Sequence, residues 1–86
     1  MDAHELVLDG RRESLTQLEF GVMRYLMDHQ GKVASRIALE SEVWGYHYHG
    51  GSNVVDAVVR SLRKKLADQA ALIQTVHGAG YRLRRR

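Results

Sequence analysis

The second half of the chain carries apolar residues at helical spacing. They recur at intervals of four, three and four residues, at Val55, Val59, Leu62 and Leu66. This spacing aligns side chains on one stripe of an α-helix. The opposite face is small and basic, with Asn53, Ala57, Arg60, Ser61 and Lys64. The pattern predicts an amphipathic helix over 53–67, with one side in a core and a basic side at the surface.

Two earlier helices are predicted, over 16–30 and 36–44. Each follows a hydroxyl residue that can cap its first turn, and each is followed by glycine. The caps are Thr16, which forms a capping-box pattern with Glu19, and Ser35; the glycines are Gly31 and Gly45. The joint between the two helices is short, so we expect them to pack closely.

Both ends of the chain predict β-hairpins. At the N-terminal end, 6–15, an apolar strand runs into the turn dipeptide Asp9-Gly10 and a second short strand returns. At the C-terminal end, 73–84, the turn is Gly78-Ala79-Gly80. Alternation places Ile73 and Val76 on opposite faces, so the pattern leaves the register of this hairpin open.

The segment 45–51 predicts a loop bounded by glycines. It contains Tyr46, His47, Tyr48 and His49. Two histidines, with His77 as a third ligand, could bind a metal, but a two-residue spacing in a loop is a weak signal. We interpret the loop as a polar, aromatic surface for protein contact and expect no metal and no other cofactor.

Composition bounds the class of protein. The 86 residues suffice for a single domain, 1–86, with one modest core. The chain has no cysteine and no apolar run of the ~20 residues that span a bilayer. Its N-terminus lacks the pattern of a signal peptide. These features predict a soluble, cytoplasmic protein without membrane contact, and no nucleophile–base–acid set indicates an enzyme.

Charge is distributed unevenly along the chain. Residues 1–50 carry a net charge of −3, and residues 51–86 carry +6. One end of the molecule should therefore show a positive field, as expected for a partner that is a polyanion.

The order of elements is hairpin, helix, short helix, loop, basic helix and basic hairpin. This order indicates an α+β fold, a winged helix-turn-helix with a three-helix core, a short N-terminal hairpin and a C-terminal β-hairpin wing. In such a fold the long helix enters a major groove of DNA and the wing reaches the adjacent minor groove.

Four segments resemble the OmpR/PhoB-type effector domain of bacterial response regulators. They are LTQLEF (15–20), GKVASRIALESEVWG (31–45), NVVDAVVRSLRKKL (53–66) and IQTVHGAGYRL (73–83). The resemblance implies a sequence-specific, phosphorylation-controlled transcription factor, with a receiver domain and a sensor kinase as partners outside this chain. It also implies binding to tandem half-sites of double-stranded DNA by a domain that is monomeric alone. Family members usually carry four strands before the first helix, whereas this chain supplies two.

The resemblance also assigns site residues. It implies base contacts from Val54, Ala57, Val58 and Ser61, and positions near phosphates for Trp44, Arg60, Arg63 and Lys64. Thr75 would touch the DNA backbone beside the wing, and His77 would lie at the wing tip. We add Asn53 and Arg82 to the DNA-binding set, and 45–51 matches the loop that meets RNA polymerase in the family.

Two positions depart from the family pattern. Many relatives have arginine where Ser61 stands, and serine cannot make the bidentate pair to guanine. Most have arginine where His77 stands, so wing binding should be weaker and pH-dependent. The alternative to DNA recognition is a winged helix that serves as a protein-interaction module.

Overall fold

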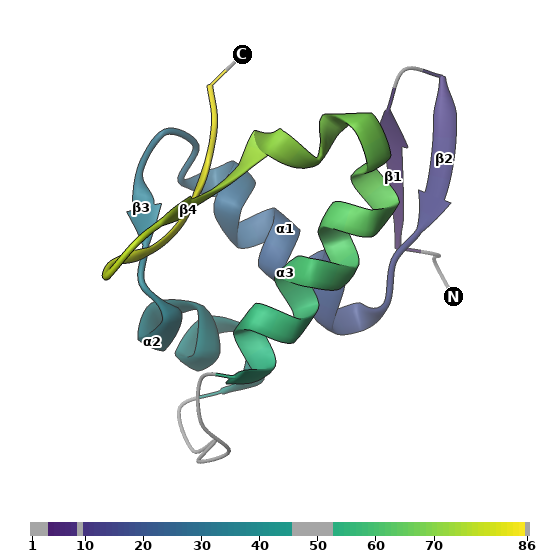
Figure 1. The fold of residues 1–86 in the computed structure, drawn as a ribbon. Coiled ribbons are helices and arrows are strands. Elements are labelled where there is room, and N and C mark those ends of the chain that lie inside the picture. Colours follow the sequence, from purple (N-terminus) through teal and green to yellow (C-terminus); the bar gives the residue numbers. More distant parts are fainter. Residues whose placement is uncertain (1–3, 9, 46–52, 86) are drawn as a thin grey trace.

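A computed structural model describes residues 4–8, 10–45 and 53–85. The helices form the centre of the molecule, with the N-terminal hairpin at one end and the wing at the other (Figure 1). The elements are β1 (Glu5–Leu8), β2 (Arg11–Ser14), α1 (Gln17–Asp28), β3 (Val33–Ala34), α2 (Arg36–Leu39), η1 (Glu40–Trp44), α3 (Asn53–Leu66), η2 (Ala67–Leu72), β4 (Ile73–Val76) and β5 (Gly80–Leu83). This is the predicted α+β arrangement of three helices with antiparallel strands.

The buried stripe of α3 organises the core. All four predicted positions, Val55, Val59, Leu62 and Leu66, are fully buried. They pack with buried residues of α1, α2 and the wing, including Val22, Met23, Leu26, Leu39, Ile73 and Leu83. Full burial of such a side chain contributes about 1.5–3 kcal/mol, so this stripe fixes the helix against the rest of the domain.

The capping box of α1 is confirmed. The Glu19 backbone N–H donates to Thr16 Oγ1 at 3.1 Å, and the Thr16 N–H donates to Glu19 Oε1 at 2.8 Å. The predicted cap of the second helix is also present, because the Ala38 N–H donates to Ser35 Oγ at 3.0 Å. These contacts satisfy amide groups that the first turns of helices leave without a partner.

The second helix changes its winding, which the sequence did not predict. The expected helix over 36–44 is α-helical in α2 and π-helical in η1. At its end the Gly45 N–H donates both to Glu40 O at 3.2 Å and to Ser41 O at 3.1 Å. The first bond spans five residues, as in a π-turn. Close packing accompanies this turn, because a side chain at Gly21 of α1 would lie 2.9 Å from Val43.

The C-terminal hairpin belongs to a three-stranded sheet of order β3-β5-β4. The short joint between the first two helices contains the strand β3, which pairs with β5 and places Ala34 opposite Tyr81. The register left open by the sequence places Ile73 opposite Leu83 and Thr75 opposite Tyr81. Gly80 allows the close approach of β3, because a Cβ there would lie 2.1 Å from the Ala34 carbonyl oxygen.

Several boundaries differ from those predicted. The helix expected over 16–30 ends at Asp28, and the helix expected over 53–67 ends at Leu66. Ala67 adopts a left-handed conformation with φ of 55°, which stops α-helical propagation. The chain then continues as the 3₁₀ segment η2. Within the described residues, no helix is both long and apolar enough to cross a membrane.

Candidate functional site

The exposed face of α3 is the centre of the candidate site. Asn53, Ala57, Arg60 and Lys64 are all exposed and lie opposite the buried stripe. Two of these side chains are cationic and Ala57 is small. A helix face of this kind can approach a groove closely while its long cations reach phosphates.

Four of the predicted contact residues on α3 lie on its flanks and are half-buried. Val54 and Val58 pack against the core cluster, and the other two are Ser61 and Arg63. Their position at the edge of the exposed face limits how much of each side chain an incoming ligand could contact.

One flank of α3 is held by a buried carboxylate of α1. The Glu19 side chain is 4% exposed and accepts a hydrogen bond from Lys65 Nζ at 2.6 Å. It also accepts a short hydrogen bond from the Ser61 hydroxyl. Lys65 Nζ donates as well to the Ser14 carbonyl oxygen at 2.8 Å. We call Glu19, Ser61 and Lys65 the α1 clamp, and it ties the C-terminal half of α3 to α1 and to the N-terminal hairpin.

Hydrogen bonds determine the charge state of Glu19. Burial opposes ionisation and alone would raise its pKa. The hydrogen bonds from Lys65, Ser61 and the Thr16 amide outweigh burial and hold the pKa below its ordinary value. The ionised carboxylate therefore keeps the Ser61 hydroxyl engaged, and the base contact that the resemblance implies for Ser61 would have to break this bond.

The other flank of α3 is held by a network that reaches α2 and the wing. Arg36 Nε donates to Asp56 Oδ1 at 2.8 Å, and the Tyr81 hydroxyl donates a short hydrogen bond to the same oxygen. Arg63 Nη2 donates to the Ile73 carbonyl oxygen at 2.6 Å and to Thr75 Oγ1 at 2.8 Å. We call Arg36, Asp56, Arg63 and Tyr81 the wing anchor.

Both titratable partners in the wing anchor favour this arrangement. The hydrogen bond from Tyr81, together with Arg36, holds the pKa of Asp56 below its ordinary value despite some desolvation. Burial, and then the hydrogen bond to Asp56, raises the pKa of Tyr81. Near neutral pH the pair is therefore a carboxylate and a protonated phenol, the combination that forms a strong hydrogen bond.

The remaining predicted contacts lie around the wing and at the end of η1. Thr75 and His77 are exposed, and Arg82 is half-buried with its Nε donating to Gln74 Oε1 at 2.9 Å. Trp44 is half-buried and packs against the core. The predicted loop residues Tyr46, His47, Tyr48 and His49 lie outside the described residues, as does any site that would combine them with His77.

Sequence reasoning missed the two flanking networks. It treated Glu19 as a cap alone and did not assign Arg36, Asp56, Lys65 or Tyr81 a role in the site. One signal was available, because Asp56 is an acidic residue on a helix whose other charged residues are basic.

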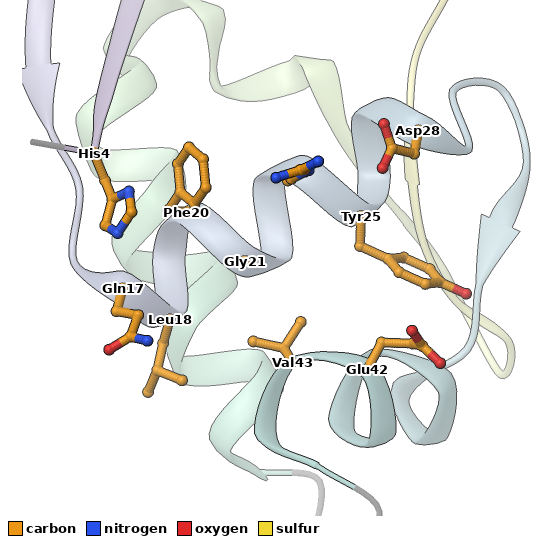
Figure 2. A pocket seen from close by; sticks show the side chains of 10 residues that line it. His4, Gln17, Leu18, Phe20, Gly21, Tyr25, Asp28, Glu42 and Val43 are labelled. Carbon is orange, nitrogen blue, oxygen red and sulfur yellow. The ribbon is translucent and has the colours of Figure 1, made fainter. Parts of the chain in front are cut away.

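A second feature is an open cleft of about 470 Å³ between α1 and η1. Figure 2 shows Phe20 and Tyr25 of α1 and Val43 and Glu42 of η1 around it, with the ring of His4 near Phe20. The His4 and Phe20 rings stack with centroids 4.2 Å apart. Across the described part of the chain, no group of three or more His, Cys, Asp and Glu residues could hold a metal ion. The walls of the cleft are mixed polar and apolar.

Comparisons with known proteins converge on one family. Residues 10–83 match the family described as "Transcriptional regulatory protein, C terminal". The chain is 38% identical over 78 residues to the response regulator protein PmrA of Pseudomonas aeruginosa. This alignment covers 91% of this chain and 34% of PmrA. The chain spans about a third of the length of the curated relatives it matches.

Solved structures agree in fold. The DNA-binding domain of Bacillus subtilis CssR superposes with a TM-score of 0.82 at 35% identity, covering 92% of this chain and 89% of that one. The Klebsiella pneumoniae RstA DNA-binding domain, solved in complex with the RstA box, superposes with a TM-score of 0.80 at 31% identity. That match covers 93% of this chain and 82% of the RstA chain.

Proposed function

The chain belongs to the family of C-terminal domains of transcriptional regulatory proteins, and we propose that it binds double-stranded DNA in a sequence-specific way through α3. The observation that carries the proposal is the exposed face of α3, which is small and cationic and stands opposite a fully buried stripe. A helix so held can enter a major groove as a rigid body. The similar RstA DNA-binding domain was solved in complex with the RstA box, which supports DNA as the partner.

Each element of the site has a proposed part in binding. Ala57 lies against base edges with help from Asn53, Val54 and Val58, while Arg60 and Lys64 neutralise phosphates. At the wing, Thr75, His77 and Arg82 approach the neighbouring minor groove. The Arg63 hydrogen bonds to the wing favour a supporting part for this residue, with any phosphate contact secondary.

The longer protein is also a matter of proposal. The response regulator protein PmrA, one of the relatives, is about three times as long as this chain. We propose that this domain is the output part of a response regulator in the bacterial cytoplasm, with a receiver domain that a sensor kinase phosphorylates. The domain alone would be monomeric and would pair on tandem half-sites. Loop 45–51, which follows η1, would contact RNA polymerase, and we assign the domain no catalytic part.

Selection of the domain against a random duplex library, at near-physiological salt, tests this function. An enriched motif that repeats at about one helical turn would support sequence-specific binding to tandem sites. Salt-sensitive binding without an enriched motif would mean that the domain contacts phosphates but does not read bases. Failure to bind any duplex would favour the protein-interaction alternative, which a pull-down that survives Lys64→Glu would then support.

A further inference from the structure

The wing is attached to the core through buried residues of β4 and β5. Ile73 and Leu83 pair in register and are both buried. The next cross-strand pair toward the tip on the same face of the hairpin is Thr75 with Tyr81, and the turn 77–79 beyond it is exposed. A hairpin of this length is only marginally stable by itself, so the angle of its tip depends on what holds the second pair.

Asp56 holds this second pair from the recognition helix. Its Oδ1 accepts hydrogen bonds from the Tyr81 hydroxyl and from Arg36 Nε. One carboxylate of α3 therefore contacts both α2 and the central strand of the wing sheet. In Figure 1, α2 and the wing lie on the same side of α3, away from the N-terminal hairpin.

Arg63 reinforces this link two helical turns later on α3. It donates to the Ile73 carbonyl oxygen and to Thr75 Oγ1 on β4. Its guanidinium carbon lies 5.7 Å from the centre of the Tyr81 ring, and that of Arg36 lies 5.2 Å from the same centre. Both distances fall within the range of cation–π attraction, so the Tyr81 ring is held by packing and by charge together.

Because β5 is the central strand, a fixed Tyr81 also fixes its neighbours. Tyr81 pairs with Ala34 on one side and Thr75 on the other. Rotation of the wing relative to α3 would therefore have to break the hydrogen bond between Asp56 and Tyr81.

We propose that Asp56 and Tyr81 are positioning residues for the wing, which set its angle to the recognition helix and thereby its reach into the minor groove without touching DNA. This inference rests on the proposed function, since it concerns how two DNA-contacting elements are held in a fixed relation. It assigns Tyr81 a separable role, because the hydroxyl makes the link while the ring fills the core.

The test uses the duplex enriched by selection and two shortened versions, each missing about half a helical turn, ~5 base pairs, at one end. The end whose loss weakens wild-type binding marks where the wing lies. We expect Tyr81→Phe to lower affinity for the full duplex about threefold to tenfold, as for one net hydrogen bond. Its affinity for the duplex shortened at the wing end should equal that of wild type. Tyr25→Phe, which removes a hydroxyl from α1, should match wild type on every duplex.

The outcomes separate the inference from the function beneath it. If wild type shows no specific binding, the proposed function fails and this inference fails with it. If wild type binds specifically but Tyr81→Phe weakens binding equally on full and shortened duplexes, or not at all, the positioning role is overturned. Should Tyr81→Phe not fold, as judged by thermal melting, Asp56→Ala provides the same comparison, because it removes the acceptor of the Tyr81 hydroxyl.

Discussion

The Ser61 hydroxyl donates a hydrogen bond to the Glu19 carboxylate, although Ser61 lies at the edge of the helix face expected to read DNA. The partner is a buried group on another helix, 42 residues earlier in the chain. This contact separates two roles that the sequence alone assigned to one face. Part of α3 is available to a ligand, and part is committed to holding the helix in place.

Replacing Ser61 with alanine tests that separation. We expect Ser61→Ala to lower the free energy of unfolding by about 1–2.5 kcal/mol, because a hydrogen bond to a charged group is lost and the helix propensity of alanine offsets part of that loss. Base preference should stay nearly unchanged in a duplex selection. A changed preference at a single base position would mean that Ser61 leaves Glu19 when DNA binds.

The two exposed cations of α3 should act on phosphates. Arg60→Ala and Lys64→Ala should each weaken binding to all duplexes alike, and each should reduce the slope of log affinity against log salt by about 0.9. Fluorescence anisotropy titrations at several salt concentrations measure both effects. The control, Arg24→Ala, removes an exposed cation from α1 beside the cleft and should leave the salt slope unchanged. If Arg24→Ala reduced the slope as much as Arg60→Ala does, only the net charge of the domain would matter.

The α1 clamp should make stability depend on pH at the acid end. Hydrogen bonds hold the folded-state pKa of Glu19 below its ordinary value, and the same is true of Asp56. Their contribution is therefore fully present above the unfolded pKa values, about 4, and is lost as pH falls through the lower folded values. Urea unfolding between pH 2 and pH 7 should show this loss.

Glu19→Gln should flatten that acid dependence and lower stability at pH 7. Asp68→Asn, which changes an exposed carboxylate on η2, serves as the control and should keep the wild-type profile. If Glu19→Gln retained the full acid dependence, the ionised clamp would not be its source.

Gly80 should be the least replaceable glycine of the wing. Its φ is +146°, and a Cβ would lie 2.1 Å from the Ala34 carbonyl oxygen. Gly80→Ala should lower the free energy of unfolding by more than about 3 kcal/mol, since backbone strain and a clash with backbone act together. Gly78→Ala is the matched control, because its φ of +78° is also unfavourable but its surroundings are open. Thermal melts giving equal losses would contradict the proposed clash.

The sequence predicted elements that depend on local pattern and missed those that depend on distant contacts. The buried stripe of α3 and the caps at Thr16 and Ser35 follow from spacing and residue type over one or two turns. The two-residue strand Val33–Ala34 is too short to show a period, and it pairs only because Gly80 admits it. The partners of Glu19 and Asp56 are residues far apart in the chain, so a single sequence gives no register for them.

The most direct test of the central claim is the ratio of specific to non-specific duplex affinity for wild type and Ala57→Leu. Ala57 is exposed at the middle of the proposed reading face, so leucine should not disturb folding but should hold α3 away from base edges. We predict that the ratio falls at least tenfold, a loss of about 1.4 kcal/mol of discrimination, while salt-dependent non-specific binding persists. An unchanged ratio in a folded variant would contradict recognition through this face of α3.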